Sequence, residues 1–284
     1  MIIERREKHM STIKRRELRR NFLKSVIIRL DFQGVLESEM EEIMVSVKAY
    51  AKEKGFSKYY EKNANQVDIE VTNNAMPESI ETTNRVRYQK VYSFIDEDRG
   101  FALHVSNSFI VLSVNTAHYT PFDEYCGIVP YIAGIFKDKI DFFTVTRFGI
   151  RKINECLIED KAKIREYFRP EYFNYYDGLK DLNNIKSNHM NVFKCGKYCV
   201  NLFTNIEQGT LESREVYSIR LDIDVYMNNS EDISMILNEK AKQDEVNDLI
   251  FGIFVSLLTD HFISLLTSDK EFNDTVIMGV EEND

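Results

Sequence analysis

The sequence predicts an α+β fold with antiparallel sheets, a meander and a hairpin, each packed with helices, and with a long buried helix near the C-terminus. Residues 216–227 alternate between apolar and polar side chains, which is the period of a strand with one face in the core. Residues 86–114 contain three short strands joined by tight turns, so neighbouring strands must run antiparallel. Residues 246–262 repeat apolar side chains at helical spacing on most sides, which is typical of a buried helix.

Composition supports a folded protein with a large core. The chain has 284 residues, 43% of them hydrophobic and 12% aromatic, which excludes a disordered protein. Its longest apolar run, 249–255, is too short to span a bilayer, and the basic N-terminus lacks the apolar region of a signal peptide. We therefore expect a cytoplasmic protein with no membrane contact. Its four cysteines are expected to be free thiols.

The first half of the chain contains the clearest strand and helix pair. Residues 26–32 alternate as a strand, and residues 36–51 form an amphipathic helix that Gly55 ends as a C-terminal cap. A second strand is expected at 66–71, before a polar loop at 73–83. The strands of the meander are expected at 86–95, 101–105 and 109–114.

The middle of the chain contains two expected irregularities. A helix begins at Pro121, and Pro130 within its apolar pattern predicts a kink or break near Gly127. A long strand at 142–158 is expected to bulge or bend sharply at Gly149.

The second half is expected to contain a strand pair and the closing helix. Strands are predicted at 192–203 and 216–227, joined across a polar loop. Residues 238–245 are polar all round and are expected to be a connection, a solvated turn of helix or a helix end, so the helical region is divided there. The organisation we expect has four parts: a basic arm (1–22), a first α+β half (23–160), an aromatic-rich connection (161–190) and a second α+β half (191–284).

Charge is distributed unevenly along the chain. Residues 1–24 contain nine Lys or Arg against three Glu, a charge of +6, which leaves −15 on the other 260 residues of a chain whose total is −9. An acidic body repels phosphate backbones, so any contact with nucleic acid would be made by the arm. On a helical arm, one side would present the basic residues Lys14, Arg15, Arg16, Arg19 and Arg20. The alternative is a charged helix that is solvated or packed on the acidic body.

Two carboxylates on the strand at 216–227 are the first candidate for chemistry. Asp222 and Asp224 share a face with Arg220, and paired carboxylates can hold a divalent cation for phosphoryl transfer. Outward charges on a solvated sheet face produce the same pattern, and no third ligand lies at a suitable spacing. A metal-dependent phosphodiesterase therefore stays an alternative.

Other signatures of enzymes are missing. Cys195, Cys199 and His189 could supply zinc ligands, but residues four apart on a strand lie roughly 13 Å apart, unless Gly196 forms a tight turn. Buried structural thiols are the preferred interpretation. The sequence has no phosphate loop, nucleophile elbow or dinucleotide fingerprint, so we expect no catalytic residue, no bound metal and no cofactor.

Several separated stretches together resemble a sporadically distributed family of uncharacterised bacterial proteins of similar length. They are VYSFIDEDRGFALHVSNSFIVLSVN (91–115), HYTPFDEY (118–125), TRFGIRKIN (146–154), LDIDVYM (221–227) and FVSLLTDHFISLL (254–266). The similarity covers residues 23–279 and leaves the arm outside. Members of that family usually have a tryptophan after the tyrosine of the central helix, where this chain has Phe122 after Tyr119.

The resemblance implies one α+β unit in a prokaryotic or mobile-element setting and implies no activity. It implies a shared polar site made from the polar members of the matching stretches, Arg147, Arg151, Asn154, Asp222 and Asp224. Arg220 lies beside the two aspartates and is added to that set. A structural role is the alternative, with Asn154 bonding the backbone at the Gly149 bend.

These observations favour a non-enzymatic binding protein that holds a protein partner or a second copy of itself, in bacterial defence or toxin control. The sheet face with the aspartates, or the aromatic segment, would hold the partner. Nucleic-acid association through the arm is the second hypothesis.

Overall fold

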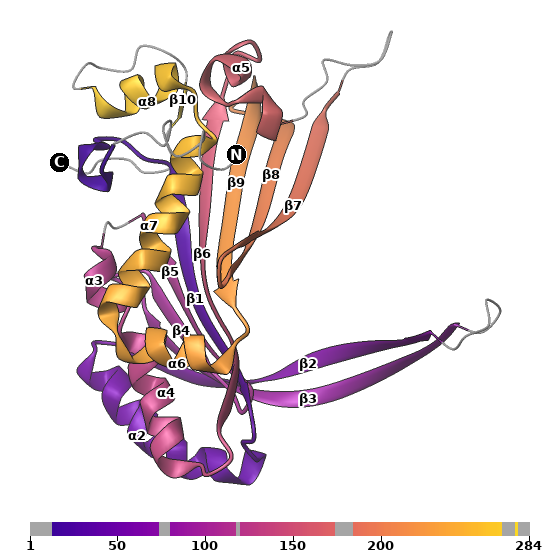
Figure 1. Cartoon of the computed structure of the whole chain (residues 1–284), viewed down its shortest axis with the longest axis vertical. Coiled ribbons are helices and arrows are strands. Elements are labelled where there is room, and N and C mark those ends of the chain that lie inside the picture. The colour runs from indigo at the N-terminus through magenta and orange to yellow at the C-terminus, as the bar shows by residue number, and fades with distance from the viewer. Residues whose placement is uncertain (1–12, 74–79, 118–119, 174–183, 269–275, 278–284) are drawn as a thin grey trace.

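The computed structural model of the chain describes residues 13–73, 80–117, 120–173, 184–268 and 276–277. Within these, the strands form one antiparallel sheet in the order β2-β3-β4-β5-β1-β6-β9-β8-β7, with β10 beside β6 (Figure 1). The strands are β1 (Leu23–Gln33), β2 (Lys58–Asn73), β3 (Ile80–Asp96), β4 (Phe101–Val105), β5 (Phe109–Asn115), β6 (Thr144–Ile158), β7 (Lys186–Cys195), β8 (Tyr198–Leu211), β9 (Arg214–Met227) and β10 (Val276–Ile277). The predicted α+β class is confirmed, and both groups of strands belong to this one sheet.

The two halves of the sheet share an arrangement. In the first half, β1 opens the segment and β5 returns to pair with it. In the second half, β6 opens and β9 returns to pair with it. The two opening strands pair antiparallel with each other at the centre, so the backbone is continuous from one half to the other.

Helices cover one face of this sheet (Figure 1). They are α2 (Met40–Glu53), α3 (Phe122–Tyr125), α4 (Ile128–Lys139), α5 (Lys163–Tyr167), α6 (Ser230–Asn238), α7 (Lys240–Ser256) and α8 (Asp260–Thr267), with 3-10 turns η2 (Arg15–Glu17), η3 (Glu37–Glu39) and η4 (Pro170–Tyr172). Helix α4 lies over β1 and β5, whereas α7 lies over β6 and β9. One apolar core between the layers extends from Phe22 to Leu266. No helix of the described residues is long and apolar enough to cross a membrane.

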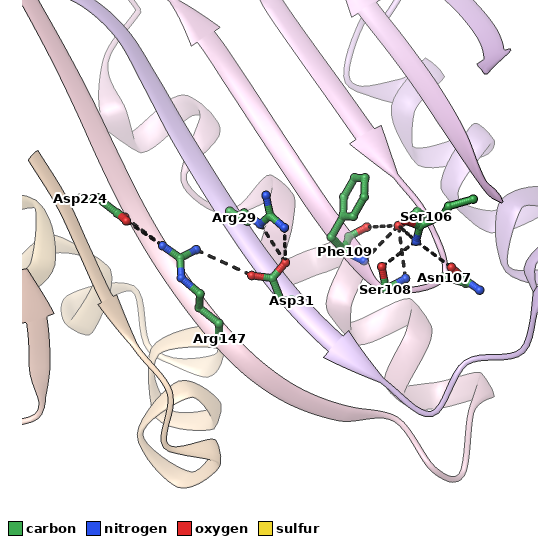
Figure 2. A network of polar contacts seen from close by, with 9 residues as sticks. Arg29, Asp31, Ser106, Asn107, Ser108, Phe109, Arg147 and Asp224 are labelled. Carbon is green, nitrogen blue, oxygen red and sulfur yellow. Dashed lines mark hydrogen bonds and ion pairs between the residues drawn. The ribbon is translucent and has the colours of Figure 1, made fainter. Parts of the chain in front are cut away.

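Strands β2 and β3 are much longer than the sequence pattern predicts. Their pairing runs without a break from Lys58 opposite Ile95 to Asn73 opposite Ile80, whereas β3 meets β4 only over Tyr92–Asp96. The rest is a two-stranded ribbon that projects away from the helix layer (Figure 1). At its base Gln89 Nε2 donates to Ser106 Oγ (2.9 Å) and Ser108 Oγ (2.6 Å) in the β4–β5 turn, and Figure 2 labels these two serines.

The closing helical segment breaks at two places. The first, at Glu239 between α6 and α7, lies within the polar stretch 238–245 where the sequence predicted a division, although α7 includes the rest of that stretch. The second was not predicted: the chain leaves helical geometry again at Leu257. There the backbone meets a second segment: Arg169 N donates to Leu257 O (2.9 Å) and Thr259 N donates to Tyr167 O (2.9 Å). These bonds satisfy groups that a continuous helix would use, so α8 starts as a separate helix. The break expected near Gly127 is present, between α3 and α4.

The bulge expected at Gly149 is wrong, because strand β6 passes through Gly149 without a register shift. The register shifts against β1 lie between Arg147 and Val145 and between Asn154 and Ile153. The glycine is needed for close approach instead. A Cβ at this position would lie 3.0 Å from Tyr226 Cβ and 3.1 Å from the guanidinium of Arg147.

The described part of the aromatic segment belongs to the core. Tyr167, Phe168 and Phe173 are buried. The Phe262 ring stacks on Tyr167 with centroids 4.5 Å apart and meets Phe168 edge-on at 5.4 Å. Tyr172 packs against the same core, and residues 174–183, with Tyr175 and Tyr176, lie outside the described residues.

Candidate functional site: the open face of the sheet

The sheet face opposite the helices carries most of the predicted polar site, and we call it the open face. Side chains of β9 alternate between buried apolar residues on the helix side and Ser218, Arg220, Asp222, Asp224 and Tyr226 on the open face. This alternation follows from the two-residue period of a strand. The sequence correctly placed the two aspartates and Arg220 on one face.

Arg151 and Asp222 form the closest ion pair on this face. Arg151 Nε donates to Asp222 Oδ1 at 2.7 Å, and its Nη2 donates to Asp222 Oδ2 at 2.5 Å. Arg220 Nη2 lies 3.3 Å from the same Oδ2. The Asp222 side chain is 5% exposed, while those of Arg151 and Arg220 are 43% and 37% exposed. The carboxylate is therefore enclosed by two guanidinium groups that still reach solvent.

A second group of ion pairs joins three strands (Figure 2). Arg147 on β6 donates from Nη2 to Asp224 Oδ2 on β9 (2.8 Å), and its Nη1 lies 3.7 Å from Asp31 on β1. Arg29 continues the series, with Nε donating to Asp31 Oδ1 at 2.8 Å. The Arg147 guanidinium also lies 4.7 Å from the Tyr226 ring centroid. Gly149, which has no side chain, leaves the space that this contact needs.

The charges extend toward the other end of the central strands. Lys24 Nζ lies 2.8 Å from Glu155 Oε2, and Ser218 Oγ donates to Glu155 Oε1 at 3.2 Å. We call the whole set the open-face network: Lys24, Arg29, Asp31, Arg147, Arg151, Glu155, Arg220, Asp222 and Asp224. Five positive and four negative groups alternate across β1, β6 and β9, so the network is close to neutral.

Burial and pairing act in opposite directions on the titration of this network. Burial raises the pKa of Asp224 above its usual value, and Arg147 and Arg151 partly oppose that rise. The hydrogen bonds from Arg151 to Asp222 raise the pKa of that guanidinium. Burial therefore disfavours the charged state of Asp224, whereas arginine guanidinium groups stay charged in proteins.

Asn154 does not belong to this face, which corrects the predicted set. It lies opposite Leu221 in the β6–β9 pair, and that position faces the helices. Its side chain is buried, and Nδ2 donates to the Leu221 carbonyl at 3.5 Å. The role is structural, as the alternative proposed, although the bonded backbone is on β9 and not at Gly149.

The two metal hypotheses gain no support from the geometry. Asp222 and Asp224 are each engaged by guanidinium groups, which occupy the oxygens a cation would need. Gly196 does form a tight turn, at φ +58°, which was the condition for a zinc site. Cys195, however, lies opposite Tyr198 and Cys199 lies opposite Lys194, so the two thiols point to opposite faces of the sheet. Cys195 is exposed rather than buried, which corrects that expectation. Among the described residues no three His, Cys, Asp or Glu side chains are grouped to hold a metal ion.

The described part of the basic arm is not a helix, so its basic residues do not line one side of one. Residues 15–17 form the short turn η2, and the backbone N–H groups of Arg19 and Arg20 donate to Leu266 O in α8 (3.0 and 3.2 Å). Arg15 forms an ion pair with Asp248 on α7. Lys14 and Arg16 are exposed. This segment packs on its own acidic body, the alternative that the sequence left open.

Lys152 is a polar residue that the sequence reasoning missed. It lies on the helix side of β6, where Nζ donates to Asn247 Oδ1 on α7 at 2.5 Å. Its pKa is lowered to about 7, chiefly by burial and also by the positive charge of Arg15, while the negative charge of Asp248 opposes the shift. The alternation of the strand could have identified it. Lys152 is an even number of residues from the buried Phe148, Ile150 and Cys156, so its side chain must lie on the helix side with theirs.

Comparisons with known proteins do not identify the chain. No protein-family model matches it, and no curated protein matches it. Among solved structures, the S. pombe Pct1 RNA triphosphatase in complex with the Spt5 CTD aligns with 95% of this chain and 92% of its own, at 10% identity. The TM-score of 0.14 is too low to support an argument about fold or function.

Proposed function

We propose that this chain is a non-enzymatic cytoplasmic binding protein that holds a protein partner on its open face. The observation that carries the proposal is the open-face network itself. It lies on the sheet face away from the helix layer, and its guanidinium groups remain partly exposed. A nearly neutral array of alternating charges gives orientation and specificity to a protein contact.

The ion pairing argues against a catalytic alternative. A phosphodiesterase needs carboxylates free to bind a cation, and here arginine side chains engage both aspartates. The nucleic-acid alternative is weakened in the same way, because Arg15 is engaged by Asp248. Lys14 and Arg16 remain exposed, so that alternative is kept as an outcome of the test.

The test uses the tagged full chain purified natively from its source cells. We expect a stoichiometric protein companion, seen as a native mass above the 33.4 kDa of the chain, with an absorbance spectrum free of nucleic acid. Arg151→Ala should release the companion. The control variant Lys139→Ala, which removes an ion pair to Glu42 in the helix layer, should still bind the companion.

Other results would count against the proposal. A monomeric mass for the unmodified chain, or equal retention by the two variants, would remove the open face as the binding surface. Excess absorbance at 260 nm that disappears when residues 1–22 are deleted would favour the nucleic-acid alternative.

A further inference from the structure

We infer that the outer edge of β7 binds an acidic, extended segment of a protein partner by adding it to the sheet as a further strand. The inference deepens the proposed function, on which it rests, because β7 is the edge at which the open face ends. It assigns both the binding mode and the chemistry of the partner.

One side of β7 has no strand neighbour in the part of the chain that the structure describes. β7 is the last strand in the sheet order, and its only neighbour among the described strands is β8. The ten residues pair with β8 without a register shift, from Lys186 opposite Glu207 to Cys195 opposite Tyr198. Because hydrogen bonding alternates along an antiparallel pair, every second residue of β7 directs its N–H and C=O away from β8.

Most devices that protect a sheet edge are missing from β7. Natural edge strands are kept from pairing by proline, bulges, short length or a covering segment. β7 has ten residues, no proline and no bulge. The remaining protection is the charge of Lys194, since Lys186 is paired with Glu207, and a single charge selects between partners instead of excluding all of them.

Exposed apolar side chains gather on the same strand. The described chain has eleven large apolar side chains that are exposed, and four of them fall within residues 185–193. They are Ile185 (64%), Met190 (66%), Val192 (64%) and Phe193 (46%). Met190 and Val192 lie opposite Phe203 and Asn201 on the open face, so an added strand would continue that face. Such a concentration on an edge indicates a contact surface.

Charge selects the partner. Residues 186–206 contain three lysines and no acidic residue, in a chain whose net charge is −9. Lys186 forms an ion pair with Glu207 on β8 (2.8 Å), so Lys194 and Lys197 supply the positive charge of this edge. A second copy of β7 would bring only basic residues to the contact, so the edge does not favour itself. A phosphate backbone would match the charge, yet it offers acceptors alone, whereas the edge presents N–H and C=O groups alternately. An acidic polypeptide strand supplies both the charge and the two kinds of hydrogen bond.

The experiment measures fluorescence anisotropy of a labelled peptide of alternating Val and Glu mixed with the full chain. Comparison probes are the same peptide with Lys for Glu, the acidic peptide N-methylated at alternate residues, and an oligo-dT strand. We expect binding of the unmodified acidic peptide only. Val192→Glu and Lys194→Glu should each weaken it by at least about tenfold. Val45→Glu, at a residue 70% exposed on α2, is the matched control and should leave it unchanged.

The possible failures are distinct. No binding of the acidic peptide, equal binding of the N-methylated form, or equal loss in Val192→Glu and Val45→Glu would overturn the strand-addition proposal. Tighter binding of oligo-dT than of the acidic peptide would assign the edge to nucleic acid and overturn the proposal. Dimerisation of the chain that Val192→Glu abolishes would assign the edge to a second copy and overturn it as well. Arg151→Ala is tested in parallel: if it still releases the native companion while the peptide fails, the open-face function stands without the edge.

Discussion

Lys152 shows how the side of the sheet on which a residue lies decides its contribution to stability. The neighbouring Arg151 faces the open side, where a carboxylate neutralises it. Lys152 faces the helices, where its hydrogen-bond partner is the neutral amide of Asn247. The charged groups around it are Arg15 on η2 and Asp248 on α7, which are paired with each other. The ammonium form is therefore held under a helix without a carboxylate of its own.

Replacing this lysine should stabilise the protein in a pH-dependent way. The folded pKa of about 7 lies below the usual 10.5, so the folded state loses stability as pH falls from about 10 to 7 and loses no more below that. Lys152→Met should raise the free energy of unfolding by about 1–3 kcal/mol at pH 6, after the cost of leaving Asn247 unpaired. The gain should shrink at pH 9.5. Urea unfolding at both pH values measures it, and an equal effect at the two would contradict the assignment.

Gly149 makes a second prediction at the scale of one residue. Alanine there would place its Cβ 3.0 Å from Tyr226 Cβ, an atom fixed to the backbone of the neighbouring strand. Gly149→Ala should therefore destabilise the fold by about 1–3 kcal/mol. Gly134 in α4 has no atom within 4 Å of an added Cβ, so Gly134→Ala should stabilise by about 0.5–1 kcal/mol. Thermal unfolding compares them, and changes of the same sign would show that close approach is not the reason for Gly149.

At the scale of elements, the start of α8 depends on its N-cap. Thr259 Oγ1 accepts a hydrogen bond from Phe262 N at 3.2 Å and donates to the Glu166 carbonyl. Thr259→Ala should cost about 1 kcal/mol of stability. The control is Ser264→Ala in the same helix, an exposed interior position where alanine is the better helix former. Denaturation midpoints measure both, and equal shifts would argue against capping.

Elements with a strong local period could be predicted from the sequence, whereas features that depend on contacts with distant parts of the chain could not. The alternation of residues 216–227 and the break near Gly127 depend on nearby residues and match the structure. The length of the β2–β3 ribbon and the end of α7 depend on partners far along the chain. The single strand predicted at 192–203 is wrong, because Gly196 and Lys197 form a hairpin turn between β7 and β8 within that range.

The candidate site divides in the same way. Alternation alone placed Asp222, Asp224 and Arg220 on one face, because the period of a strand is local. The arginines of β6 that reach the aspartates depend on the register between β6 and β9, which no local pattern contains. Asn154 entered the predicted set as a polar member of the stretches that carry the family resemblance. Its position an even number of residues from Ile150 on β6 places it on the helix side instead.

At the scale of the whole molecule, the centre of the sheet joins the two halves at several levels. The backbones of β1 and β6 pair, Arg147 links Asp31 on β1 to Asp224 on β9, and one apolar core extends beneath both halves. Chains of this size often unfold in steps, because separate cores melt separately. Here neither half has a core of its own, so opening one half would expose the paired strand and the core of the other.

We therefore predict a single cooperative unfolding transition. In scanning calorimetry the van't Hoff and calorimetric enthalpies should agree, and far-ultraviolet circular dichroism should give the same midpoint. Arg147→Ala removes the ion pairs that cross the centre and should lower that midpoint without dividing the transition, because strand pairing and the shared core remain. Lys139→Ala, which removes an ion pair within the helix layer, should shift it less, since exposed pairs contribute about 0–1 kcal/mol. Two resolved transitions in the unmodified chain would show instead that the halves fold independently and that the central pairing is secondary.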